Sequence, residues 1–205
     1  MANLDLRRHL PSTAFVVLLL AVLAGVAGIF VYVGVYNIAA DAPHTPSVYN
    51  FLHELRDRSI ARRSRDIRPP ADLNSPKRVS TGAGLYNEMC TGCHLAPGME
   101  PTEMSQGLYP PAPRLAHDPS HTPAQQFWII KHGVKLTAMP AWGKTHSDDL
   151  IWDMVAFLQR LPKMSPEQYK AAVASAPEDH EEMMKGMSGE PGAAQEHEHG
   201  HQDSR

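Results

Sequence analysis

The sequence has little cysteine and no strong excess of charge of either sign. Only two of its 205 residues are cysteine, which excludes a framework of several disulfides. Lysine and arginine number 19 against 22 aspartate and glutamate, so the formal net charge is −3. Nucleic acid is therefore not an expected partner, because no surplus of positive charge is available to follow a phosphate backbone. Strand patterns are also missing between the helical signals, which favours an all-α fold.

One long segment near the start contains no charge at all. It runs from Pro11 to Ala40, and its dense apolar part, residues 14–35, would rise about 33 Å as a helix against a hydrocarbon core of about 30 Å. We expect a transmembrane anchor over residues 13–37, preceded by a cytoplasmic segment at residues 1–12. Such an anchor makes the membrane itself a partner of the chain.

A cleaved signal peptide is the alternative interpretation of the same segment. Arg7 and Arg8 make a basic start, and Ala40-Asp41-Ala42 has the small-x-small form of a cleavage site. The apolar core of a signal peptide is only about 7 to 15 residues long, so the retained anchor is favoured. The two arginines flank the span more closely than the arginines at 56–68, which places the amino terminus inside and the rest of the chain outside.

Five further helices are predicted after the anchor. Residues 38–77 form a linker rich in arginine and proline, and its helix at 47–63 either lies at the headgroup surface or is a solvated spacer. Three helical signals follow, and a short helix is expected at 165–175. The three signals run from about Ser80 to Cys90, from the Thr122 capping box to Gly133, and from Ser147 to a point before Pro162.

The last segment, residues 176–205, is rich in glutamate, glycine, histidine and methionine. It has almost no aromatic or β-branched residues, so we expect a disordered tail. Its histidines and methionines suit soft or borderline ions such as copper, and a solvated end without metal is the alternative. The residues concerned are His180, Met183, Met184, Met187, His197, His199 and His201.

The two cysteines belong to one motif, Cys90-Thr91-Gly92-Cys93-His94. This is the attachment pattern of c-type haem: each thiol adds to one vinyl group, and the imidazole of His94 becomes the proximal iron ligand. A structural zinc site would need a second ligand pair, and a thioredoxin-like centre would open a helix after a strand. Neither context is present, so the motif predicts one covalently attached haem c.

Residues 82–161 resemble the class I cytochrome c domain. The matching elements are Gly82 with Tyr86 before the motif, Pro113-Arg114-Leu115 after it, Met139-Pro140, and a closing amphipathic helix. The resemblance implies a small fold of three to four helices around the haem, over residues 78–164. One departure is Leu95, which stands where many members of the family have a glycine.

The resemblance also implies the other residues that contact the haem. Met139 is the expected sixth ligand, and the carbonyl of Pro113, or in reserve that of Pro111 or Ala112, is expected to accept the second ring N–H of His94. Tyr86 and Trp142 are expected to pack on or near the haem. Rivals for the sixth position are His132, Met99 and Met104, while Met154 is expected in the core. His117, His121 and His146 are expected on the surface.

These features predict a single-electron carrier rather than an enzyme. The apolar span, the arginines before it and the haem motif together predict an inner-membrane protein with one span and a haem domain in the periplasm or another extracytoplasmic space. Its redox partners would be a quinol-oxidising complex or dehydrogenase on one side and a terminal oxidase or reductase on the other. The alternatives are a copper-handling or redox-sensing haem protein that uses the tail, and a cytochrome subunit of a larger oxidoreductase.

Overall fold

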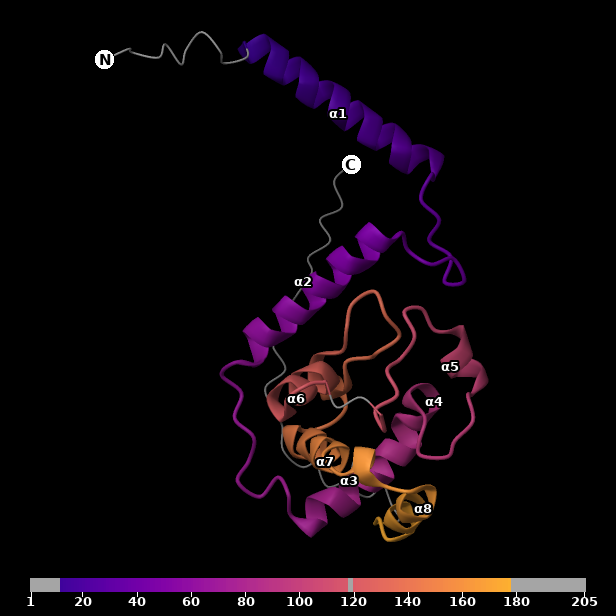
Figure 1. Cartoon of the computed structure of the whole chain (residues 1–205). Helices are drawn as coiled ribbons and strands as arrows, with labels where there is room; N and C mark the ends of the chain where they lie inside the picture. The colour runs from indigo at the N-terminus through magenta and orange to yellow at the C-terminus, as the bar shows by residue number, and fades with distance from the viewer. Residues whose placement is uncertain (1–11, 118–119, 178–205) are drawn as a thin grey trace, which may run out of the picture. The chain divides into compact units, whose positions relative to one another are not determined.

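The computed structural model describes residues 12–117 and 120–177, and within them the chain is all-α (Figure 1). The chain divides after Ala42 into two compact units, a first helix and a second, larger unit. The α-helices are α1 (Thr13–Val33), α2 (Pro46–Ser64), α3 (Pro76–Met89), α4 (Thr91–His94), α5 (Glu103–Gly107), α6 (Pro123–His132), α7 (Asp148–Leu158) and α8 (Pro166–Ala174). Two 3-10 turns, η2 (Trp142–Lys144) and η3 (Leu161–Lys163), flank α7.

The first unit is built around α1, whose two ends are closed by local hydrogen bonds. The Ser12 hydroxyl accepts the Phe15 N–H at 3.2 Å, and Gly34 ends the helix with φ 68°, a conformation that glycine adopts without steric cost. The 21 residues of α1 make it long and apolar enough to cross a membrane, by length and composition.

The core of the second unit lies where α3 and α7 cross. Every residue from Leu150 to Leu158 of α7 except Asp153 is buried. From α3 the aromatic ring of Tyr86 reaches this core and lies 5.5 Å from the ring of Phe157. The close approach depends on Gly82, because a Cβ there would overlap the Asp153 carbonyl and lie 2.9 Å from the Phe157 Cβ. Gly82 and Tyr86 are one turn apart and face the same helix.

Several helix boundaries follow the signals that the sequence predicts. Thr122 with Gln125 and Ser165 with Gln168 form complete capping boxes at α6 and α8, and the Ser147 hydroxyl accepts the Leu150 N–H at 3.4 Å. By contrast, α3 begins at Pro76 rather than near Ser80, because Ser75 is its N-cap and proline at the first helical position is pre-set for a helix.

The helix predicted in the linker is present as α2, and it packs against α6. Ile60 is 2% exposed and Ser64 is 4% exposed, so one face of α2 is fully covered. The Ser64 hydroxyl donates to the Ile60 carbonyl at 2.8 Å, which satisfies this buried polar group within the helix. The linker is therefore part of the compact unit over this stretch.

Arg78 ties the start of α3 to α7 and to the preceding turn. Its guanidinium lies 2.7 Å from Asp153, 3.0 Å from Asp72 and 3.2 Å from Asp149. Burial alone would lower the pKa of Arg78, but the hydrogen bonds to the three aspartates raise it above its ordinary value. Because Asp72 and Asp149 are mostly exposed, water screens these two contacts more than the contact with Asp153, whose side chain is 13% exposed.

The prediction that His146 lies on the surface is wrong, since this residue is 6% exposed. Its backbone N–H donates to the Trp142 carbonyl at 2.9 Å, and its ring meets the Trp142 ring edge-on at 5.5 Å. The turn η2 brings the histidine under the tryptophan, a contact that residue type alone does not reveal. His132, in contrast, is exposed at the end of α6, as expected.

Replacing Gly82 with alanine should lower the free energy of unfolding by about 3 kcal/mol, because the added methyl group forces α3 and α7 apart. In an unconstrained helix the same change would stabilise by about 1 kcal/mol. The control is Gly107→Ala at the end of α5, where a Cβ meets nothing within 4 Å. Denaturant unfolding followed by circular dichroism measures both; equal stability of the two variants would contradict the importance of this crossing.

Candidate functional site

The Cys-x-x-Cys-His motif forms the end of α3 and the short helix α4. Cys90 is the last residue of the α3 hydrogen-bond ladder, since its N–H donates to the Tyr86 carbonyl at 2.9 Å. The Cys90 carbonyl then accepts the N–H groups of Cys93, at 3.2 Å, and of His94, at 2.8 Å. One tight turn therefore carries both thiols and the imidazole, and it is continuous with a helix that packs in the core.

Leu95, directly after the motif, has a backbone conformation that favours glycine. Its φ is 59° and its ψ is 178°, a combination that costs a non-glycine residue about 1 to 3 kcal/mol. Three contacts hold it: the side chain is 5% exposed, the N–H donates to the Thr91 carbonyl at 3.0 Å, and the carbonyl accepts the Tyr86 hydroxyl at 2.6 Å. The backbone at this position thus accounts for the glycine that is common there.

The His94 imidazole is oriented by a backbone carbonyl. Of the two prolines considered from the sequence, it is Pro113 whose carbonyl oxygen lies 2.8 Å from His94 Nδ1. A carbonyl can only accept, so Nδ1 carries the proton and donates it, which leaves Nε2 with a lone pair in the neutral ring. Burial lowers the pKa of His94, and the hydrogen bond to Pro113 offsets this only in part, so the ring is neutral at pH 7.

Both cysteines are free thiols in partly covered positions. Cys90 packs against the hydrophobic core, and burial, followed by the neighbouring Cys93, raises the pKa of its thiol above the ordinary value. Cys93 Sγ lies 3.3 Å from Met104 Sδ in α5. The Thr102 hydroxyl caps α5 and also donates to the Gly92 carbonyl at 2.5 Å, which holds this helix against the motif.

Met139 lies on a loop whose shape is set by local hydrogen bonds. Its N–H donates to Thr137 Oγ1 at 3.1 Å, and its carbonyl accepts the Val134 N–H at 3.2 Å. Gly133 is required where α6 ends, because it has φ 65° and a Cβ there would lie 2.7 Å from the Met139 carbonyl oxygen. The Met139 side chain is partly buried against the same core as Cys90.

The two aromatic residues named from the sequence differ in how deeply they are buried. Tyr86 is 1% exposed, and its ring packs between α7 and α8, 6.4 Å from the ring of Tyr169. Trp142 is only partly buried, and it packs against the core from η2. The structure therefore brings Tyr86, Cys90, Met139 and Trp142 to one hydrophobic cluster.

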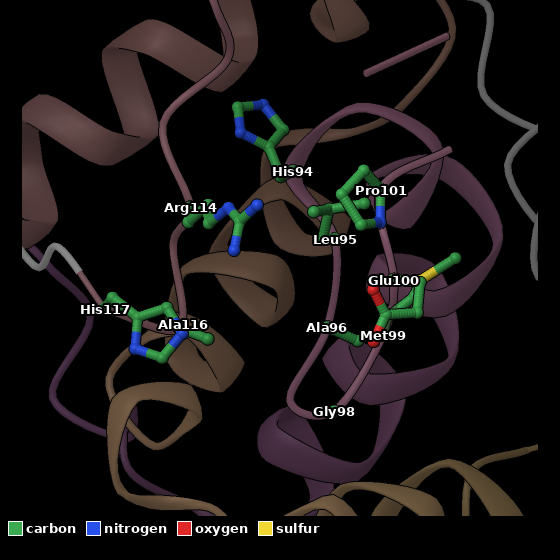
Figure 2. Close-up of a pocket in the computed structure, with 10 residues that line it drawn as sticks. All are labelled: His94, Leu95, Ala96, Gly98, Met99, Glu100, Pro101, Arg114, Ala116 and His117. Atoms are coloured by element: carbon green, nitrogen blue, oxygen red, sulfur yellow. The ribbon is translucent and has the colours of Figure 1, made fainter. Parts of the chain in front are cut away.

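A pocket of about 340 Å³ lies beside His94, on the segment that follows the motif (Figure 2). Arg114 and His117 line it together with Met99 and Glu100, and in Figure 2 the Arg114 side chain lies next to His94. No role is predicted for Arg114 from the sequence, although its position directly after Pro113 is a signal that it lies near the imidazole. His117 was expected on the surface, and it lines the wall of this open pocket.

The residues present fit a covalently attached haem. The donor set consists of two thiols without a disulfide, a neutral imidazole with a free Nε2 and a preformed methionine loop. In the part of the chain that the structure describes, no group of three or more histidine, cysteine, aspartate or glutamate side chains is placed to hold a metal ion by itself. The thiols and the imidazole therefore match the chemistry of a porphyrin better than that of a bare ion.

Leu95 offers a test of the backbone conformation at the motif. Leu95→Ala keeps the disfavoured φ and also loses buried apolar surface, which should lower the free energy of unfolding by about 3 kcal/mol. Leu95→Gly loses the same side chain but removes strain of about 1 to 3 kcal/mol, so it should be more stable than the alanine variant. Parallel denaturant titrations give the order; an alanine variant as stable as the glycine variant would show that position 95 is unstrained.

The comparisons with known proteins bear on the same segment. Residues 77–158 match the model of a protein family described as cytochrome c oxidase, cbb3-type, subunit III. No match was found among curated proteins or among solved structures. The matched residues include the motif, Pro113, the Met139 loop, all of α7 and all of α3 except Pro76. Residues 77–158 of this chain are therefore a monohaem c-type cytochrome domain, with haem c as its covalently bound cofactor.

Proposed function

We propose that this chain carries single electrons at the extracytoplasmic surface of a bacterial-type inner membrane, anchored there by α1. The observation that carries the proposal is the His94 imidazole, held by the Pro113 carbonyl at 2.8 Å on the turn that also presents both thiols. This arrangement prepares a proximal ligand of defined tautomer. Such a ligand suits an iron that gains or loses one electron while its ligands stay in place.

In this proposal Cys90 and Cys93 would hold the porphyrin through thioether links, and His94 Nε2 and Met139 Sδ would be the protein ligands of its iron. The bound haem supplies a one-electron iron couple. Met139 raises the reduction potential and closes the iron to outside ligands. The His94 Nδ1–H, donated to Pro113, keeps the ring orientation and tautomer fixed. Tyr86 and Trp142 exclude water with their aromatic bulk.

The membrane location rests on α1 and on the charges that flank it. Arg7 and Arg8 precede the span, which supports an amino terminus inside and a cytochrome domain in the periplasm. Anchoring raises the effective concentration of the carrier near its partners. Its donor would be a quinol-oxidising complex or a dehydrogenase, and its acceptor a terminal oxidase or reductase. The carrier itself performs no substrate chemistry.

A second candidate is a cytochrome subunit of a larger oxidoreductase. The observation that favours it is the description of the matching family as a subunit of a cytochrome c oxidase. Purification in a mild detergent separates the two candidates, since a carrier would be isolated alone and a subunit would be isolated with its complex. The copper site predicted at positions 180–201 lies outside the described residues and stays a prediction.

The sixth ligand is tested by replacing one methionine at a time in the haem-loaded full chain. Met139→Leu should remove the weak sulfur-to-iron absorption at the red end of the oxidised spectrum, because leucine fills the same volume without a donor atom. Loss of the thioether should lower the midpoint potential by roughly 0.2 V, within the span of about 0.8 V that axial ligands cover. The ferrous variant should bind carbon monoxide rapidly, unlike the wild type.

Met104→Leu is the matched control, because Met104 Sδ is 3.3 Å from Cys93 Sγ and yet is not the proposed ligand. Its spectrum and potential should match those of the wild type. If Met104→Leu loses the absorption and Met139→Leu keeps it, the ligand assignment is wrong. Reversible one-electron titration of the wild type tests the carrier role, and a ferrous wild type open to carbon monoxide would count against it.

A further inference from the structure

The helix α2 has two faces of different character. Its inner face holds Ile60 and Ser64, which are buried where α2 packs against α6. On the opposite face, Phe51 is 67% exposed and Leu55 is 55% exposed. These two residues are one turn apart, half a helical rotation away from Ile60. A pair of large apolar side chains is thus presented outward from a helix that is fixed to the cytochrome unit.

Arginines continue the same outward stripe. Counting from Phe51 and Leu55, positions 58 and 62 recur at the i+3 and i+4 spacing of one helix face. Arg58 and Arg62 are both exposed, and Arg58 pairs with Glu54 at 2.5 Å. From residue 46 to residue 68 there are six arginines against three acidic residues, whereas the whole chain has a formal charge of −3. Residues 46–68 thus have an excess of positive charge in a chain whose net charge is negative.

The chain itself limits how far this face can be from the membrane. The span ends at Val33 and α2 begins at Pro46, so only the twelve residues 34–45 lie between them. Fully extended, they reach at most about 42 Å. A tether of this length keeps α2 at a high local concentration near the bilayer surface, which makes even a weak affinity for lipid effective.

We propose that the outward face of α2 docks on the anionic headgroup surface of the membrane that α1 spans, with Phe51 and Leu55 inserted and Arg58 and Arg62 on lipid phosphates. This inference rests on the anchoring in the proposed function. Apolar side chains next to arginines on one helical stripe are the pattern of helices that lie in the interface. Because the other face is fixed to α6, docking of α2 sets the orientation of the whole cytochrome domain toward the bilayer.

The test uses the haem-loaded full chain in lipid nanodiscs. Both native cysteines are then in thioether links, so a nitroxide spin label attaches only to an introduced cysteine. Leu55→Cys places the label on the proposed docking face, and Lys170→Cys places it on the exposed surface of α8 as the control. An unchanged haem spectrum shows that each variant is folded. The depth of each label in the bilayer is measured as a ratio: the spin relaxation caused by oxygen, which dissolves in lipid, divided by that caused by a water-soluble nickel chelate.

In discs that contain phosphatidylglycerol, the Leu55 label should be relaxed more by oxygen, and the Lys170 label more by the nickel chelate. Arg58→Gln with Arg62→Gln should lower the ratio of docked to undocked α2 by about 25-fold, since each arginine near an anionic surface contributes about fivefold. Discs of phosphatidylcholine alone should give the same loss. Protection of the Leu55 label that depends on neither anionic lipid nor the two arginines would overturn the proposal.

The same experiment separates docking from anchoring. If the chain does not float with the discs in a density gradient, the anchor is wrong, and the docking proposal fails with it. If the chain floats and the Leu55 label is in water in every lipid mixture, only the docking proposal is overturned. In that case the outward face of α2 is available to bind a protein partner.

Discussion

The contact between α3 and α7 determines where the haem-binding residues lie. Because Gly82 has no side chain, the two helices approach until the Asp153 carbonyl reaches the α3 backbone. That approach buries Tyr86, and the Tyr86 hydroxyl in turn holds the Leu95 carbonyl at 2.6 Å. Leu95 follows His94 directly, so the helix crossing in the core is linked through the Tyr86 side chain to the backbone beside the imidazole that ligates iron in the proposed carrier.

Much of the architecture could be predicted because its signals are local. Serine and threonine caps, proline at the first helical position and glycine at the last are read within four residues, and they located α6, α7 and α8. The motif at 90–94 is equally local, and it predicted the cofactor that the family match supports. Local hydrogen bonds determine these features, and they depend little on the rest of the fold.

Features set by distant contacts could not be predicted in this way. The burial of Ile60 depends on α6, which lies more than sixty residues further along the chain. The unusual φ of Leu95 follows from a hydrogen bond to Tyr86, and α5 owes its place to Thr102, which also holds Gly92. In each case the deciding partner is tertiary, and no pattern of neighbouring residues indicates it.

The loop around Met139 has a consequence for the speed of electron exchange. Both backbone groups of Met139 are bonded within the loop, to Thr137 and to Val134, and Gly133 fastens the loop to the end of α6. These bonds hold the backbone that carries the thioether, and the side chain is partly buried against the core, so the loop is shaped without a bond to iron. A ligand held in this way moves little when the metal gains or loses an electron, so the nuclear reorganisation that slows electron transfer stays small in the proposed carrier.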